Sequence, residues 1–376
     1  MRDVLGELKR GYASGRTVGL ATVVGTYRSA PRQPGAAMVV APDGTVAGSV
    51  SGGCVEGAVY ELAQQVVDAG EPQLVRYGVS DDDAIAVGLT CGGIIDVLVE
   101  PIDTGLFPEL GKVIEAIEEH RPVAIATLIR GAPPARLVVW PDRTEGSLGS
   151  AGLDSAVTDD ARGMLEHGAT GLRRYGRLGQ RRRDDVEVFV HSFAPAPRML
   201  IFGAIDYAAA MAGMGSLLGY RVTLCDARAV FATPARFPDA DEVVVDWPHR
   251  YLAGTEVDAR TVICVLTHDP KFDVPLLEVA LRTPAGYIGA MGSRRTHADR
   301  LARLREAGLT EAELERLASP IGLDIGARTP EETAVSIAAE IVATRWGGTG
   351  QRLSATAGRI HGGDEEQLPP VSMYDQ

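Results

Sequence analysis

The sequence predicts an α/β protein with two domains, an N-terminal mixed α/β domain and a C-terminal Rossmann-like domain with a doubly wound parallel sheet. Three observations support this prediction. The chain of 376 residues is long enough for two domains with separate cores. A Pro-rich segment at 194–197 is typical of a linker. Beyond it, short apolar runs alternate with helix-like stretches, as in parallel sheets. We therefore expect domains at 1–193 and 194–346, followed by a mobile polar tail at 347–376.

Strands and helices both occur in the first domain. Helical patterns lie at 4–12, 58–67 and 108–120, and strand patterns at 18–24, 37–40, 74–77, 94–99, 123–129, 136–140 and 186–191. Pro42-Asp43-Gly44 predicts a hairpin turn, because Pro and Gly adopt the backbone angles that tight turns require. Residues 142–185 have weak periodicity, and no internal repeat is evident along the chain.

In the second domain, apolar runs predict strands at 199–202, 220–224, 242–245, 261–266 and 287–290. Two cysteines, Cys225 and Cys264, lie inside these runs, where packing as small apolar side chains is expected. Thr329, Pro330 and Glu332 predict a capped helix start: an N-cap, a first-turn proline and the returning acid of a capping box.

Composition excludes several function classes. Lys and Arg number 37 against 50 Asp and Glu, a net charge of −13, which argues against binding to nucleic acid or an anionic membrane. No run approaches the roughly 18 apolar residues of a membrane span, and the N-terminus lacks the apolar core of an export signal. We expect a cytoplasmic protein. No structural metal site is predicted, because the glycine-flanked cysteines have no His nearby.

The segment at 48–57, a loop of small residues that carries Cys54, is the most informative stretch. Consecutive small residues let backbone N–H groups approach an anion closely, and a loop that leads into a helix directs its first amides there. A thiol at such a turn is predisposed to a lowered pKa. The alternative is a tight glycine-rich turn with a small buried cysteine. The residues by themselves leave both interpretations open.

At the start of the second domain, a partial dinucleotide fingerprint follows the first strand. Gly203 suits the tight turn, Ala208 suits helix packing, and Asp226 ends the second strand at the spacing of a ribose-binding acid. Ile205, however, replaces the glycine that lets pyrophosphate approach the backbone. We therefore predict a Rossmann-like scaffold with altered or lost nucleotide binding, and conventional NAD(P) binding is the alternative.

Polar residues follow two further strands of the second domain. His268 follows the fourth strand, and Ser293 and Arg294 follow the fifth. Ligands of doubly wound sheets bind at the carboxyl ends of strands, and Ser and Arg at a helix start suit a phosphate. Each residue alone has an ordinary role in loop hydrogen bonding. Their convergence on one edge predicts a ligand-binding crevice.

Four separated motifs, in this order, resemble the XdhC/CoxI family: residues 48–56, 91–93, 287–294 and 320–332. The resemblance implies a maturation factor, not itself catalytic, that binds molybdenum cofactor (molybdopterin). It also implies delivery of that cofactor, in sulfurated form, to the apoenzyme of a xanthine dehydrogenase-type or carbon monoxide dehydrogenase-like molybdenum hydroxylase. A cysteine desulfurase is a further expected partner, and we expect a homo-oligomer. An N-terminal family domain and a C-terminal Rossmann domain are implied as well.

The resemblance also implies which residues contact the cofactor: Ser51, Gly52, Gly53, Cys54 and Glu56, together with Cys91, Gly92 and Gly93. To these we add the polar residues of the loop after the first strand, Arg28, Arg32 and Gln33. No catalytic residue is identified. The chain departs from the family pattern at Ile205 and Asp206, where relatives commonly have Gly and His. Two alternatives remain: an NAD(P)-dependent oxidoreductase that uses Gly203 and Asp226, and a sulfur carrier that uses Cys54 and Cys91.

Overall fold

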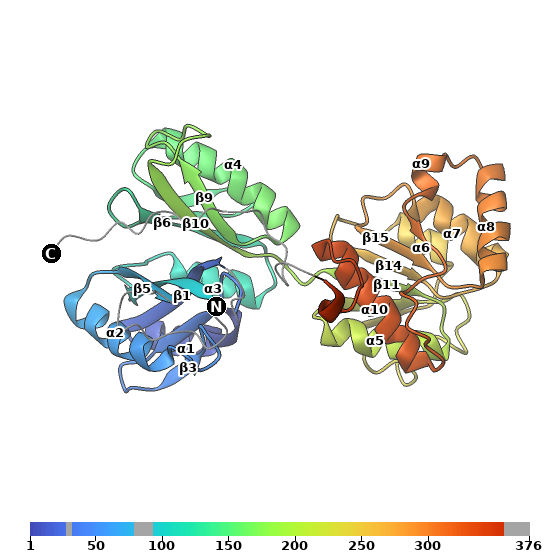
Figure 1. The fold of residues 1–376 in the computed structure, drawn as a ribbon, viewed down its shortest axis with the longest axis horizontal. Helices are drawn as coiled ribbons and strands as arrows, with labels where there is room; N and C mark the ends of the chain where they lie inside the picture. The colour runs from blue at the N-terminus through green and yellow to red at the C-terminus, as the bar shows by residue number, and fades with distance from the viewer. Residues whose placement is uncertain (28–31, 79–92, 357–376) are drawn as a thin grey trace. The chain divides into compact units, whose positions relative to one another are not determined.

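The computed structural model describes residues 1–27, 32–78 and 93–356, and its chain divides between residues 195 and 196 into two compact units (Figure 1). We call them the N-terminal unit and the C-terminal unit. Each has its own hydrophobic core and is described by itself.

Two five-stranded antiparallel sheets form the N-terminal unit. The first has the order β3-β2-β1-β5-β4. Its strands are β1 (Val18–Tyr27), β2 (Ala37–Val40), β3 (Val46–Gly48), β4 (Gln73–Gly78) and β5 (Ile94–Ile102). Helix α2 (Glu56–Ala69) connects β3 to β4. The first residues of the chain form a short 3-10 helix (Arg2–Val4) and α1 (Leu5–Ala13). The predicted hairpin turn at 42–44 joins β2 to β3.

The second sheet has the order β8-β7-β6-β10-β9. It comprises β6 (Val123–Arg130), β7 (Ala135–Val139), β8 (Thr144–Ser147), β9 (Gly171–Tyr175) and β10 (Val186–Phe193). Helix α4 (Ala151–His167) connects β8 to β9, and α3 (Leu110–Glu118) lies between the two sheets in sequence. Three of these elements, β8, α4 and β9, lie in the range where the sequence pattern was weak.

The two halves of the N-terminal unit repeat the same fold. Strand order, and the place of the helix after the third strand, are identical in both. An arginine on the fourth strand pairs with an acid opposite it on the fifth strand in each half: Arg76 with Asp96, and Arg174 with Glu187. The interpretation of the sequence as having no internal repeat is therefore wrong. Topology and equivalent contacts show this repeat.

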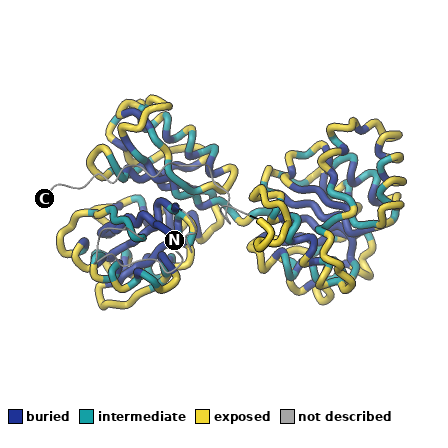
Figure 2. The backbone as a smooth tube through the Cα atoms, viewed as in Figure 1, coloured by how far each residue is buried: buried dark blue, intermediate teal, exposed yellow. Residues whose placement is uncertain are grey.

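Four layers make up this unit. A core between the sheets includes Leu20 and Ile102 from the first repeat and Ile125 and Phe193 from the second. The other face of the first sheet packs against α2, and the other face of the second sheet packs against α4. Figure 2 shows the strands as largely buried and the outer sides of the helices as exposed. Because strand side chains alternate between faces, each sheet contributes to two cores.

The C-terminal unit contains a six-stranded parallel sheet of order β13-β12-β11-β14-β15-β16, which confirms the predicted Rossmann-like fold. Its strands are β11 (Arg198–Phe202), β12 (Arg221–Cys225), β13 (Glu242–Val244), β14 (Val262–Val265), β15 (Tyr287–Ala290) and β16 (Leu317–Ala318). The sequence pattern missed β16, because a two-residue strand has no detectable alternation.

Helices cover both faces of this sheet. On one face pack α5 (Asp206–Leu217) and α10 (Pro330–Trp346), and on the other α6 (Pro248–Ala253), α7 (Pro270–Ala280), α8 (Arg294–Glu306) and α9 (Glu311–Leu314). The capping box between Thr329 and Glu332 at the start of α10 is present, as predicted. Both Cys225 and Cys264 are buried in strands, and burial raises the pKa of each thiol to about 12. None of the helices in the described ranges is long and apolar enough to cross a membrane.

Candidate functional site

The loop that carries Cys54 joins β3 to α2, and we call residues 49–55 the Cys54 loop. Gly48 ends the strand with a φ of 81°. A Cβ atom at this position would lie 2.3 Å from the carbonyl oxygen of Ala37, so only glycine fits. Val50 and Val55 are buried in the core beneath α2 and anchor both ends of the loop.

Glu56, the first residue of α2, organises the whole loop. Its Oε1 accepts hydrogen bonds from the Ser49 hydroxyl at 2.6 Å and from the amides of Val50 at 3.2 Å and Ser51 at 2.9 Å. Its Oε2 accepts from the Ser51 hydroxyl at 2.6 Å and from the amides of Gly53 at 2.8 Å and Val55 at 3.2 Å. One carboxylate therefore receives six hydrogen bonds from a loop of seven residues.

Hydrogen bonding sets the charge state of this carboxylate. Burial by itself raises the pKa of Glu56, but the hydrogen bonds from Ser49 and Ser51 outweigh burial and lower the pKa from 4.5 to about 2. Glu56 is thus a permanent anion at neutral pH. It occupies the N-terminal end of α2, where a negative charge is favoured.

The expectation that the loop amides face an external anion is wrong for residues 50–55. Four of these amides donate to Glu56. The remaining two, of Gly52 and Cys54, donate to the hydroxyls of Ser49 and Ser51 at 2.8 and 3.0 Å. The chain supplies its own anion, which the glycine-rich pattern alone did not reveal.

Two glycines form the exposed part of the loop, and Cys54 follows them. Gly52 and Gly53 are exposed and have φ values of 78° and 117°, which favour glycine. A Cβ atom at either position would meet no described atom within 4 Å. Cys54 is half-buried and packs against the core beneath α2. Of the other residues expected here, Gly93 is buried just before β5, whereas Cys91, Gly92 and Arg28 lie outside the described residues.

The second repeat contains an equivalent loop without a thiol. Its acid, Asp154, accepts from the Ser147 hydroxyl and the Leu148 amide at 2.7 Å each, as Glu56 does from Ser49 and Val50. In both repeats the acid lies seven residues after the serine. Where the first loop has Cys54, this one has Gly152, whose Cβ position lies 2.4 Å from the Leu178 carbonyl oxygen. Only the first loop has a thiol, and the second is covered by its own chain.

Arg32 and Gln33, predicted from the loop after the first strand, border a cavity of about 350 Å³ in the N-terminal unit. Arg2, His191 and Ser192 border the same cavity. Sequence reasoning missed these three residues, because the start of the chain, the approach to β2 and the end of β10 are far apart in sequence and meet only in the fold.

In the C-terminal unit, the dinucleotide fingerprint residues do lie together, but they bond to each other. Asp226 accepts from the amide of Ala204 at 2.8 Å, next to Gly203. It also accepts from the amide of Arg228 and, through both carboxylate oxygens, from the Arg228 guanidinium at 2.9 and 2.7 Å. Although burial raises the pKa of Asp226, these bonds lower it overall. Its carboxylate is committed to the protein itself.

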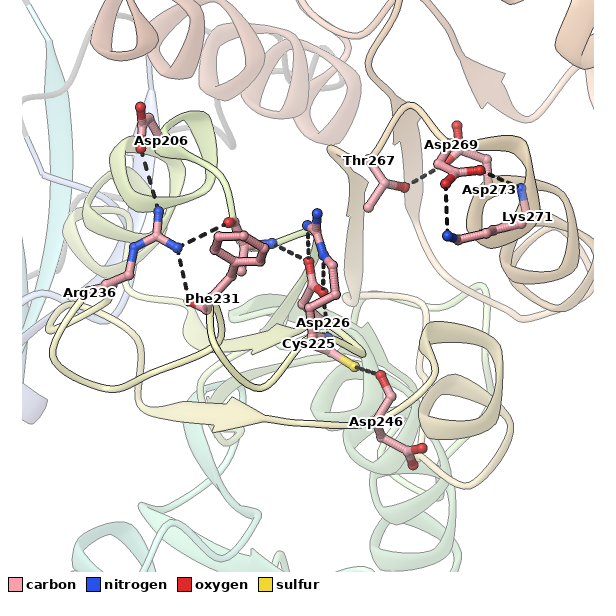
Figure 3. Close-up of polar contacts among 12 residues, drawn as sticks. Asp206, Cys225, Asp226, Phe231, Arg236, Asp246, Thr267, Asp269, Lys271 and Asp273 are labelled. Atoms are coloured by element: carbon pink, nitrogen blue, oxygen red, sulfur yellow. Dashed lines mark hydrogen bonds and ion pairs between the residues drawn. The ribbon is translucent and has the colours of Figure 1, made fainter.

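A segment after β12 folds over this turn (Figure 3). The ring of Phe231 stacks on the guanidinium of Arg228 at 4.8 Å, and Arg236 donates to the carbonyl oxygens of Phe231 and Ala204. Arg236 also pairs with Asp206 at 3.6 Å. These contacts surround the place where pyrophosphate approaches the backbone in ordinary Rossmann domains.

The other residues expected at the crevice, His268, Ser293 and Arg294, do not all lie in one cavity. His268 is exposed and borders a cavity of about 100 Å³ between α7 and α8, together with Thr296 of the first turn of α8. Ser293 caps α8 by accepting from the Thr296 amide at 3.1 Å. Arg294 is exposed at the same helix start. Of the residues expected at the crevice, His268 borders this cavity, whereas Ser293, Arg294, Gly203 and Asp226 do not. Within the described ranges, no group of three or more His, Cys, Asp or Glu side chains is placed to hold a metal ion.

Comparison with known proteins gives concordant matches. The model of the XdhC Rossmann domain matches residues 199–341, and the model of the XdhC and CoxI family matches residues 12–78 and 116–176, one segment in each repeat. A Bacillus subtilis protein, named as a probable xanthine dehydrogenase subunit, is 28% identical over 87% of this chain and 92% of its own length. The molybdenum cofactor insertion chaperone PaoD of Escherichia coli is 28% identical over 96% of this chain and 89% of its own.

Among solved structures, a crystal structure described as a xanthine dehydrogenase from Bacillus halodurans matches with a TM-score of 0.68 and 25% identity. The match covers 94% of this chain and 97% of that one. It therefore includes both units of the chain. Together with the family models, it shows that the chain belongs to the XdhC and CoxI family.

Proposed function

We propose that this protein binds molybdenum cofactor at the Cys54 loop and delivers it to a molybdenum hydroxylase of the xanthine dehydrogenase type. The relative PaoD, which aligns with nearly the whole chain, is a molybdenum cofactor insertion chaperone, and this supports the proposal. The observation that carries it is the thiol of Cys54, held on a loop that Glu56 fixes from within. The second repeat, which lacks the thiol, serves as an internal comparison.

The residues of this loop fit the cofactor by the chemistry of their donors. A thiolate is a soft ligand, suited to a metal bound by sulfur, and the two adjacent glycines place no side chain in its way. When bound, the cofactor supplies the redox-active metal that the client enzyme needs. In this proposal Gly52, Gly53 and Cys54 contact the ligand. Ser51 and Glu56 act by positioning them.

The finer expectations from the family resemblance extend the same proposal. They are transfer of the cofactor in sulfurated form, help from a cysteine desulfurase, carbon monoxide dehydrogenase-like clients, a homo-oligomeric state and a cytoplasmic location. The protein holds and hands over its ligand without turnover of its own.

Replacing Cys54 by serine or alanine is expected to reduce cofactor retention at least about tenfold, a loss of about 1.4 kcal/mol of binding free energy. Because the side chain is small and half-buried, both variants should fold, which circular dichroism and thermal unfolding check. The measurement is molybdenum and pterin content after gel filtration of protein loaded with cofactor. Retention equal to that of the wild type in both variants would reject the role of the thiol.

Titration with NAD(H) and NADP(H) tests the oxidoreductase alternative. We expect no binding at millimolar concentration, because Asp226 is already bonded to Arg228 and Ala204, and because Ile205 occupies the pyrophosphate-facing turn. Isothermal titration calorimetry on the full chain gives the answer directly. Micromolar binding would instead favour dinucleotide chemistry in the C-terminal unit.

A further inference from the structure

The cavity in the N-terminal unit has the composition of an anion-binding site. It measures about 350 Å³, within the range of ligand pockets. We call it the edge pocket. Its lining comes from the start of the chain, from the approach to β2 and from the end of β10, and it includes Arg2, Asp3, Arg32, Ala36, His191 and Ser192. Both repeats therefore contribute to one pocket.

Charge in the edge pocket favours an oxyanion. Two guanidinium groups, of Arg2 and Arg32, border it against one acid, Asp3. Asp3 pairs with Arg32 at 3.0 Å, but its side chain is 68% exposed, so solvent screens the pair. Guanidinium groups match the geometry of phosphate oxygens and bind them through paired hydrogen bonds.

Two polar side chains of β10 have no hydrogen-bond partner among the described residues. The ring of His191 stacks on Phe193 with centroids 4.2 Å apart and receives no hydrogen bond from a described group. Burial and the nearby positive charges hold the pKa of His191 well below its ordinary value, so the ring is neutral and has one N–H donor. The Ser192 hydroxyl is buried and unpartnered within the described ranges. A buried hydroxyl in this state is uncommon and favours a ligand that satisfies it.

The first repeat shows how the chain treats the equivalent position. His191 lies opposite Ile125 in the pairing of β10 with β6, and Glu100 lies opposite Leu20 in the pairing of β5 with β1. One carboxylate oxygen of Glu100 pairs with the guanidinium of Arg136, which also stacks on the ring of Phe107. Glu100, Arg136 and His191 all border a second, small cavity of about 30 Å³. In the first repeat the polar side chain has an arginine partner, whereas His191 has no hydrogen-bond partner among the described residues.

The edge pocket adjoins the Cys54 loop. Ala36 borders the pocket, and the carbonyl oxygen of the next residue, Ala37, accepts from the amide of Ser49 at 3.0 Å. Ser49 is the first residue of the Cys54 loop. Ala36 and Cys54 also pack against the same core beneath α2. The edge pocket and the first residue of the Cys54 loop thus meet at two consecutive residues, Ala36 and Ala37.

We propose that the edge pocket, through Arg32, Arg2 and His191, binds a phosphate monoester, the anionic end of the ligand whose other end lies at Cys54. Molybdopterin carries such a phosphate, so the identity of the ligand rests on the proposed function. The prediction that the pocket binds a phosphate group does not rest on that function, because inorganic phosphate presents the same oxygens.

Pterin fluorescence with the full chain tests this proposal. The probes are the oxidised pterin of the cofactor with its phosphate and after enzymatic removal of the phosphate. We expect the wild type to bind the phosphorylated form at least about tenfold more tightly, as for loss of a charge-assisted contact. Arg32→Ala and His191→Phe should bind both forms equally weakly, and inorganic phosphate should compete only with the phosphorylated form. His191→Phe keeps the aromatic packing on Phe193.

Arg16→Ala is the matched control, because it removes one exposed positive charge of the same unit from outside the pocket. It should discriminate between the two forms as the wild type does. Equal binding of both forms by the wild type, or discrimination retained in Arg32→Ala, would overturn the proposal while leaving the role of Cys54 intact. If the wild type binds neither pterin, the retention measurement with intact cofactor decides the proposed function. In that case ³¹P NMR with inorganic phosphate tests whether the edge pocket binds an anion. Phosphate binding by the wild type that is lost in Arg32→Ala supports an anion site, and absence of phosphate binding by the wild type rejects it.

Discussion

Replacing Glu56 by glutamine is expected to destabilise the N-terminal unit by roughly 3 kcal/mol and to release the Cys54 loop from its fixed conformation. Each carboxylate oxygen accepts three hydrogen bonds. An amide NH₂ in place of either oxygen would therefore face three donors and leave them unsatisfied. Urea unfolding measures the loss of stability. Backbone amide exchange at residues 50–55 measures the loss of loop order.

Stability should also fall with acid, because Glu56 has a lowered pKa in the folded protein. Its contribution is fully present above the unfolded pKa of 4.5 and is lost as the pH falls towards about 2. The difference in stability between the wild type and Glu56→Gln should therefore shrink across this interval. A difference that stays constant from pH 6 to pH 3 would contradict the hydrogen-bonding account of the loop.

Asp154→Asn provides the matched control in the second repeat. Asp154 organises the equivalent loop, so this variant should also lose stability. Cofactor retention should survive in it, because that loop has no thiol and its outer side is covered at Gly152. Glu56→Gln should lose both stability and retention. If Glu56→Gln retained the cofactor as well as Asp154→Asn and the wild type do, the Cys54 loop would need no fixed conformation.

Replacing Asp273 by alanine is expected to destabilise the C-terminal unit by about 3–5 kcal/mol. Asp273 pairs with Arg300 at 2.9 Å, and the two side chains are only 4% and 3% exposed. Arg300 also donates to the Ser319 hydroxyl and to the Met291 carbonyl oxygen, so it joins α8 to the ends of two strands. Loss of Asp273 leaves the buried charge of Arg300 without its counter-ion. Urea unfolding followed by tryptophan fluorescence measures the effect.

Two further variants make this prediction specific. Asp299 is an exposed acid that borders, as Asp273 does, the cavity between α7 and α8. Asp299→Ala should change stability by less than about 0.5 kcal/mol. The double variant Asp273→Leu with Arg300→Met should recover much of the loss, because replacing a buried ion pair by apolar side chains is often neutral. Asp273→Ala within about 1 kcal/mol of the wild type would show that water reaches the buried pair.

Much of the fold could be predicted because its signals are local. The strands of the C-terminal unit are short apolar runs, and the start of α10 has a capping box within four residues. Burial of Cys225 and Cys264 followed from the runs that contain them. The pattern failed where the signal is sparse. In α4, for example, glycine, alanine and polar residues occupy most of the positions.

The candidate site was predicted only in part. The Cys54 loop was located correctly between a strand and a helix, but the role of Glu56 was not recognised. A signal was present: a serine followed seven residues later by an acid, at Ser49 and Glu56 and again at Ser147 and Asp154. Comparing these two segments would have indicated both the internal repeat and the acid that organises each loop.

The sequence by itself determined the two-domain organisation, the parallel sheet of the C-terminal unit and the loop that carries Cys54, because each depends on residues close together in the chain. Only the tertiary structure decided which polar groups are satisfied. Asp226 is committed to Arg228, the loop amides to Glu56, and the edge pocket brings Arg32 to His191. Apolar periodicity records which face of an element is buried. The partner of a buried polar group, in contrast, often comes from a distant segment, and only folding brings the two together.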